Sequence, residues 1–130
     1  MSDNTSNTDW GTEYILGSVK KQLGISQDDA SFDIDITNSI NMALAELNQL
    51  GAFNDAYLSS DTQTWNDLLK DYGDNTSSTN IKSMARQYVF LSTKIVFDPP
   101  ENSSVLQSYE RVIDQLAWRI LQEAEVGTES

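Results

Sequence analysis

Closely spaced acids near the start of the chain are the first residues that could do chemistry, because carboxylates can hold a hard cation. Four of them fall between positions 28 and 35: Asp28, Asp29, Asp33 and Asp35. A calcium-binding loop needs alternating oxygen ligands, a central glycine for its turn and a bidentate glutamate at its end. No glycine lies close after Asp35, and the next glutamate is Glu46. The pattern therefore favours acids that cap and flank a helix start, and we expect no metal site.

The remaining composition argues against an enzyme. The chain contains neither cysteine nor histidine, which removes disulfides, thiolate metal sites, cysteine nucleophiles and imidazole bases. The sequence also contains no phosphate-binding glycine loop, nucleophile elbow or dinucleotide fingerprint. We therefore expect no catalytic residues and no cofactor. A hydrolase built on paired carboxylates alone stays open as a minor alternative, and it would show an activity that depends on a divalent ion.

Two tryptophans are better candidates for binding than for catalysis. Trp118 falls at the edge of an apolar stripe beside Arg119, and tryptophan and arginine are over-represented at interface hot spots. The position of Trp118 is equally consistent with the margin of a core and with a contact to a neighbouring subunit or partner. Trp10 lies in a polar N-terminal segment, where an aromatic side chain can anchor a partner surface.

The charge limits the kinds of partner. Twenty acids against eight bases give a net charge of −12, and such a surface repels the phosphates of nucleic acids and of anionic membranes. Acidic charge is most often a solubility device, but it also suits a surface that lies near DNA without binding it, a mimic of DNA, or a docking face for a basic partner. No stretch approaches the ~20 apolar residues that span a bilayer, and residues 1–9 do not resemble a signal peptide. We expect a soluble, intracellular protein.

Apolar residues at helical spacing predict an all-α fold, a small bundle of four to five helices with two long loops and flexible termini. One helical domain is expected over residues 12–125, with disordered tails at 1–11 and 126–130. Thr12, Asp33 or Asp35, and Thr79 or Asn80 are the expected caps of the first, second and long third helix. The predicted helices cover residues 13–23, 36–50, 64–70, 81–96 and 104–125, and the two loops cover residues 52–62 and 71–80.

The segment from Phe97 to Ser104 joins the last two long helices. Pro99 and Pro100 prevent the preceding helix from continuing, and Ser103 or Ser104 can cap the next one. This segment predicts a helical hairpin with a fixed corner at Asp98, Pro99 and Pro100.

Several motifs occur together in one order along residues 13–121. They are residues 15–25, 32–36, 40–51 and 64–69, Ile81-Lys82, residues 97–100, and Trp118-Arg119. In this order the chain resembles the head–tail connector proteins of tailed bacteriophages, also called adaptor or head-completion proteins.

The resemblance implies a structural protein that assembles with copies of itself as a ring, usually twelve-fold, beneath the portal protein. Such a ring extends the DNA channel, through which DNA passes without specific binding, and it gives the tail or a stopper (head-closure) protein a docking surface. The implied location is the head–tail interface of the virion, after assembly in the host bacterial cytoplasm.

The resemblance also implies where the contacts lie. The C-terminal stretch 104–130 is expected to contact the portal or neighbouring subunits, through Tyr109, Arg111, Trp118, Arg119, Gln122 and Glu123. Loops 52–62 and 71–80 are expected to contact a subunit or the tail, through Phe53, Tyr57, Leu58, Tyr72 and Asp74. Alternatively, Phe53, Tyr57 and Leu58 pack their loop onto the core.

The alternative function is an acidic DNA mimic that inhibits a nucleic-acid enzyme. It accounts for the charge, but a mimic needs regularly spaced acids on one exposed face. Basic residues interrupt the acids of the long helices: Lys82, Arg86, Lys94, Arg111 and Arg119.

Overall fold

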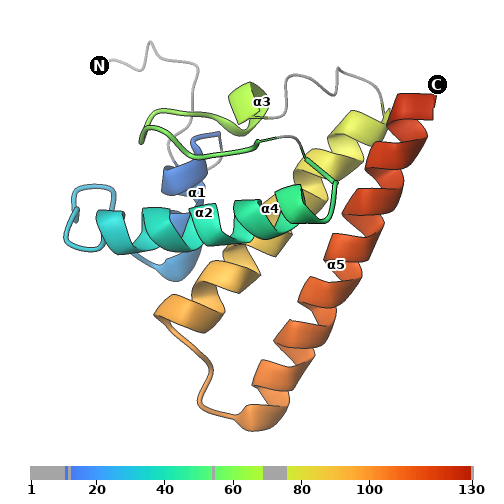
Figure 1. Ribbon diagram of the computed structural model, residues 1–130. Helices are drawn as coiled ribbons and strands as arrows, with labels where there is room; N and C mark the ends of the chain where they lie inside the picture. Colours follow the sequence, from blue (N-terminus) through green and yellow to red (C-terminus); the bar gives the residue numbers. More distant parts are fainter. Residues whose placement is uncertain (1–10, 12, 54, 69–75, 130) are drawn as a thin grey trace.

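The computed structural model describes residues 11, 13–53, 55–68 and 76–129. Within these residues the fold is all-α, as predicted, and the one β contact is an isolated bridge between Tyr14 and Thr64. The helices are α1 (Ile15–Leu23), α2 (Asp33–Gln49), α3 (Trp65–Leu68), α4 (Thr76–Phe97) and α5 (Ser103–Glu129) (Figure 1).

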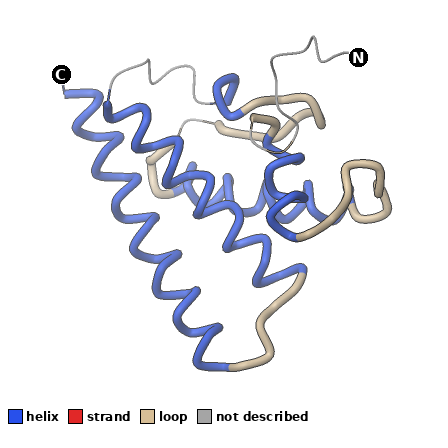
Figure 2. Tube along the Cα trace, turned by 180° about the vertical axis from the view of Figure 1, so that it is seen from behind, coloured by secondary structure: helices blue, strands red, loops and turns tan. Residues whose placement is uncertain are grey.

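The two longest helices, α4 and α5, form an antiparallel hairpin. Helices α1 and α2 pack on α4, whereas α5 packs chiefly on α4 alone. Figure 2 shows the same arrangement from behind, with α5 along one side of the molecule and the loop between α1 and α2 at the other. The position of α5 therefore leaves much of its surface uncovered.

The core forms where the apolar stripes of α1, α2 and α4 meet. The stripe of α2 is almost completely buried at Ile36, Ile40 and Leu44, each 0% exposed, as its three- and four-residue spacing predicts. Trp65 of α3 is also buried, and its indole N–H donates to the Ser18 hydroxyl at 3.0 Å. The other buried apolar residues are Ile15, Leu16, Val19, Ala43, Leu47, Ala52, Phe53, Leu58, Ile81, Ala85, Tyr88, Val89 and Ile120.

Several helix ends differ from the predicted ones. Asp33 is the first residue of α2 and not its cap, and Phe32 at the cap position makes no side-chain hydrogen bond. Helix α4 begins at Thr76, so the described part of the predicted loop 71–80 is helical. Serine, threonine and asparagine are weak helix formers, but they do not stop a helix as proline does.

The ends of α5 also differ. Its cap is Asn102, whose side-chain oxygen accepts hydrogen bonds from the backbone N–H of Ser104 at 2.8 Å and of Val105 at 3.4 Å. The prediction of Ser103 or Ser104 was wrong by one or two residues, because the helix already begins at Ser103. Helix α5 continues to Glu129 and not only to residue 125, since the glycine at position 127 costs only about 1 kcal/mol in a helix.

Three predictions at the N-terminus concern residues that are not described. The disordered tail at 1–11, the anchor Trp10 and the cap Thr12 lie outside the described residues, apart from Gly11. Gly11 is buried, and a Cβ atom at this position would overlap the side chain of Lys21. Helix α1 begins two residues later than predicted, at Ile15. The single domain over 12–125 stays a prediction.

Candidate functional site

An open groove of about 460 Å³ runs between the first turns of α4 and the C-terminal half of α5. Its lining residues are Asn80, Ser83 and Met84 from α4, and Trp118, Arg119, Gln122 and Glu123 from α5. The structure thus brings together four of the six predicted interface residues of α5. We call this surface the α4–α5 groove.

The α4–α5 groove is positioned by the stripe of α5 that packs on the core. Ile120 is fully buried, and Leu116 and Leu121 are half-buried beside it. Trp118 points away from Ile120, because two helix residues span about 200°, and it is 61% exposed. Trp118 is therefore not part of the subunit core, and its interface role stays a prediction.

Arg119 differs from the basic residues of α4 in having no partner among the described residues. Lys82 donates to the Asn66 side chain at 2.6 Å, and the Lys94 ammonium lies 3.3 Å from the Asp98 carboxylate. The Arg86 guanidinium lies over the Trp65 ring at 5.7 Å, and burial lowers its pKa. Since these α4 cations are engaged within the subunit, exposed Arg119 is the one in the α4–α5 groove that can bind a carboxylate of another chain.

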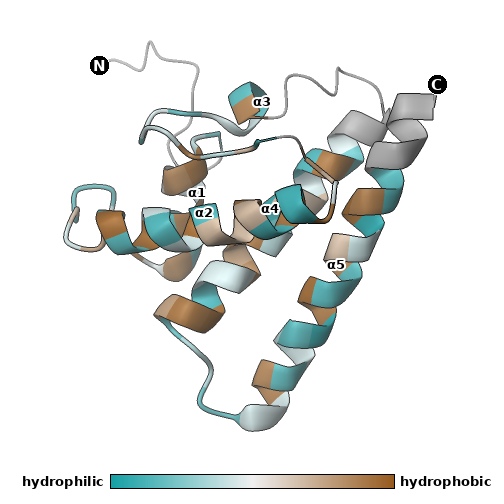
Figure 3. Cartoon of the chain, in the orientation of Figure 1, coloured by the Kyte–Doolittle hydropathy of each residue, from teal (hydrophilic) through white to brown (hydrophobic). Residues whose placement is uncertain are grey.

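Tyr109 and Arg111 lie outside the α4–α5 groove, on the N-terminal half of α5. Tyr109 is half-buried and Arg111 is exposed. The apolar stripe is also exposed here, with Val105 and Val112 at 39% and 40%, and apolar colour recurs along α5 upward from the corner in Figure 3. Ile120 is the one buried side chain among those described for α5. Apolar side chains that stay exposed along one side of a helix are available to a neighbouring chain.

The loop over residues 52–62 packs onto the core through two of its three aromatic and aliphatic candidates. Phe53 and Leu58 are 5% and 3% exposed, whereas Tyr57 is 62% exposed. The Asn41 side chain bonds both backbone groups of Leu58, and Asn48 does the same at Ala56.

The predicted contact residues of this loop therefore fall into two groups, buried and exposed. Phe53 and Leu58 hold the loop in place and are not accessible to a partner, while Tyr57 is accessible. Tyr72 and Asp74 lie outside the described residues. Asn41 and Asn48 were not predicted from the sequence, because their bonds to this loop reach 17 and 8 residues along the chain.

The corner between α4 and α5 is held by local contacts. The backbone N–H of Asp98 donates to the carbonyl of Lys94 at 2.8 Å, next to the ion pair of their side chains. The Phe97 ring meets the Phe32 ring edge-on, with centroids 5.2 Å apart. Pro99 is exposed and Pro100 half-buried. These contacts fix the end of α4 against the start of α2.

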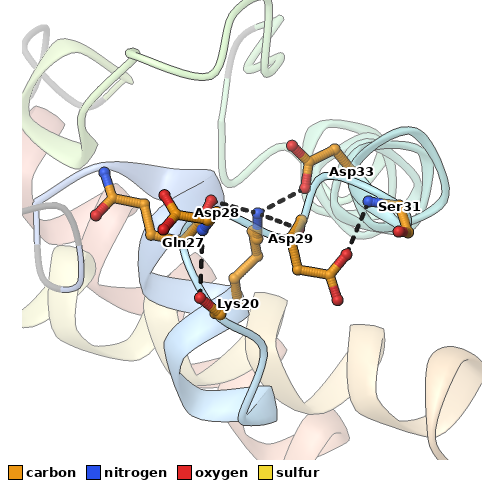
Figure 4. Close-up of polar contacts among 7 residues, drawn as sticks. Lys20, Gln27, Asp28, Asp29, Ser31 and Asp33 are labelled. Atoms are coloured by element: carbon orange, nitrogen blue, oxygen red, sulfur yellow. Dashed lines mark hydrogen bonds and ion pairs between the residues drawn. The ribbon is translucent and has the colours of Figure 1, made fainter.

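A buried lysine explains the acids at positions 28–35. Lys20 is 2% exposed, and its ammonium lies 2.8 Å from the Asp33 carboxylate (Figure 4). It also donates to the backbone carbonyls of Asp29 at 2.8 Å and Gln27 at 3.3 Å. The Asp29 side chain accepts a hydrogen bond from the backbone N–H of Ser31 at 3.0 Å, and bonding to Ser31 lowers the pKa of Asp29.

We call these contacts the Lys20 clasp. Lys20 was not among the candidate residues that the sequence indicated. Lys20 follows Leu16 by four residues, so it shares the apolar face of α1. The Lys20 ammonium therefore lies among the acids that were considered as a possible metal site. Among the described residues, no three acidic side chains lie close enough together to hold a metal ion.

Comparison with known proteins identifies the chain. The model of the phage connector protein family matches residues 15–127, and the chain belongs to this family. This confirms the resemblance found in the sequence. No curated protein and no solved structure matches the chain significantly.

Family membership assigns the chain to a class of structural phage proteins that associate with proteins of the head or tail. Its class is therefore non-enzymatic. Over the described residues, no helix combines the length and the apolar character required to cross a membrane.

Proposed function

We propose that this protein is a head–tail connector subunit that forms a ring beneath the portal protein, twelve-fold when it matches the portal. The ring extends the DNA channel and gives the tail or a head-closure protein a docking surface, at the head–tail interface of the virion. Membership of the phage connector family carries this proposal. The predicted portal and subunit contacts of α5 and of the exposed loop residue Tyr57 belong to it.

The uncovered face of α5 supports a subunit that is completed by neighbours. Among the described side chains of α5, Ile120 alone is fully buried, and Val105, Val112 and Trp118 are exposed. The subunit therefore leaves part of the apolar surface of α5 uncovered. Burial of that surface is favourable by about 25 cal/mol per Å². In a ring, two neighbouring subunits and the portal could bury this apolar surface.

The charge suits a conduit for DNA. A net charge of −12 on each subunit, repeated around a ring, repels phosphates within about one Debye length of the channel wall, ~8 Å at physiological salt. The same charge opposes closure of a free ring. We therefore expect a monomer in dilute solution and assembly on the portal, where many weak contacts act together.

The test is to mix the protein with the portal of the phage that encodes it and to image the product by negative-stain microscopy. We expect a ring of added density on the outer end of the portal, with the symmetry visible directly. Trp118→Ser should reduce the occupancy of this ring. The matched control is Met42→Ser on α2, because Met42 and Trp118 are equally exposed, at 62% and 61%.

Two results would count against the proposal. One is a folded protein that does not associate with an intact portal. The other is equal loss of binding in both variants, which would mean that the α4–α5 groove has no special role. In the first case the acidic inhibitor becomes the leading function, and titration of a nuclease with the protein tests it.

A further inference from the structure

A second hollow, of about 270 Å³, lies where the start of α2 meets α1 and the loop before α3. Its lining residues are Leu16, Asp33, Ile34, Thr37, Asn38 and Asp61. Ile34 is 77% exposed, more than the other exposed large apolar side chains of the described residues. An aliphatic side chain this exposed at the edge of a hollow is accessible to another chain.

The hollow combines an apolar wall with acidic charge. Leu16 and Ile34 form the apolar part. Asp33 is already paired with Lys20, so Asp61, which is exposed, supplies the uncompensated negative charge. A ligand that fits must offer a flat or aliphatic group and, next to it, a cation.

The chain itself carries this pair of groups. Trp118 and Arg119 are adjacent and exposed in the α4–α5 groove. They cannot reach the hollow of their own subunit: the first turns of α2 and the C-terminal half of α5 lie on opposite sides of the molecule in both views (Figures 1 and 2). Only a second copy can bring the two surfaces together.

We propose that Trp118 and Arg119 of one copy dock in the hollow of the next copy, with Trp118 against Ile34 and Arg119 paired with Asp61. Charge complementarity favours a second copy as the occupant. Two subunits of charge −12 repel, and this contact sets an unpartnered cation of one against an acid of the other. The contact joins two different surfaces, so it does not close as a two-fold dimer, and it builds a ring when the rotation from one copy to the next closes.

The inference rests on the proposed ring, whose subunit contact it names. Its test uses disulfide trapping, because the chain has no cysteine of its own. Asn38 borders the hollow and Gln122 borders the α4–α5 groove, and both are exposed. The double variant Asn38→Cys/Gln122→Cys keeps Trp118 and Arg119 intact.

We expect oxidation of this double variant, bound to the portal or concentrated to about 1 mM, to give a ladder of covalent oligomers. Each single variant has one thiol and can give no more than a dimer. The matched control is Asn38→Cys/Gln107→Cys. Gln107 is exposed on the same helix, about 22 Å from Gln122 along the axis, and this pair should give at least about tenfold fewer oligomers.

A charge exchange tests the ion pair itself. In the trapping background, Arg119→Glu should reduce the ladder at least about tenfold. Adding Asp61→Arg should restore most of it, because the charges are then exchanged and not removed. Failure of Asp61→Arg to restore the ladder would overturn the Arg119–Asp61 pairing.

The outcomes separate this inference from the proposed function. A ring on the portal without the ladder overturns the inference and leaves the function in place. A ladder in solution without portal binding supports the inference and overturns the portal role. Absence of both ring and ladder overturns both.

Discussion

Replacing Lys20 by methionine tests the Lys20 clasp, which positions the start of α2. Methionine keeps the length and the apolar character of the buried stem, so the change removes mainly the ammonium group. Three oxygen atoms then lose their partner: the Asp33 carboxylate and the carbonyls of Asp29 and Gln27. The loop between α1 and α2 loses its link to α1.

The expected cost follows from the burial of each partner. Removal of one member of a buried ion pair typically costs about 3–5 kcal/mol. The Asp33 side chain is 29% exposed and can regain water, so we expect Lys20→Met to lower the free energy of unfolding by about 2–3 kcal/mol. Asp33→Asn should cost more, about 3–5 kcal/mol, because it leaves an ammonium that is only 2% exposed without its counter-charge.

Urea unfolding followed by circular dichroism measures these costs. With a slope of about 1.5 kcal/mol per M urea, Lys20→Met lowers the midpoint by about 1.3–2 M. The control is Lys94→Met, since the Lys94–Asp98 pair is 25% and 66% exposed and should contribute at most about 1 kcal/mol. The Lys20 effect should persist in 1 M salt, because buried pairs are screened little.

The double variant Lys20→Met/Asp33→Asn decides whether the two residues act as a pair. Its cost should be well below the sum of the single costs, because neither partner is left as a buried charge. Two results would refute the reasoning: additive costs, or a cost for Lys20→Met no greater than that of Lys94→Met.

Three further predictions follow from single contacts. Trp118→Ala should change the free energy of unfolding by less than about 0.5 kcal/mol while weakening assembly on the portal at least about tenfold, measured by thermal melting and by binding. Burial, assisted by Glu46, raises the pKa of Tyr88 above its ordinary value. The unfolded chain therefore loses this proton first, and stability falls as the pH rises above about 10. Urea titrations at about pH 9 and about pH 11 should show a smaller fall for Tyr88→Phe. Asn102→Ala should cost about 1 kcal/mol as the cap of α5, whereas Ser104→Ala should cost less than half of that in the same urea assay.

The helices could be predicted because their signals are local. The apolar spacing of α1, α2 and α4 and the proline pair before α5 depend on neighbours within a few residues. The caps were less predictable, because several residues near each helix start can serve. Asn102 was not chosen as the cap of α5, although it is as good a cap as serine, and only the path of the chain after the prolines selects it.

The Lys20 clasp could not be derived in the same way, because its parts come from three separate positions. The sequence shows a lysine on an apolar face and a group of acids about ten residues later. It does not show that the loop folds back so that two carbonyls and one carboxylate meet the same ammonium. The loop at 52–62 posed the same difficulty, because its backbone at Ala56 and Leu58 is held by the side chains of Asn48 and Asn41 from α2.

The apolar stripe of α5 shows why the sequence could locate the candidate site but could not show how much of it stays exposed. Helix α2 and helix α5 have the same three- and four-residue apolar spacing, yet the stripe of α2 is buried and that of α5 is buried only at Ile120 among its described residues. Spacing identifies which face is apolar and contains no information on what covers it. That information lies in the packing, which places α5 chiefly against α4. The apolar residues that the spacing identifies but the subunit does not bury thus form the difference between pattern and packing, and this difference measures the surface left for other chains. In this protein the difference is clear on the N-terminal half of α5, where Val105 and Val112 stay exposed.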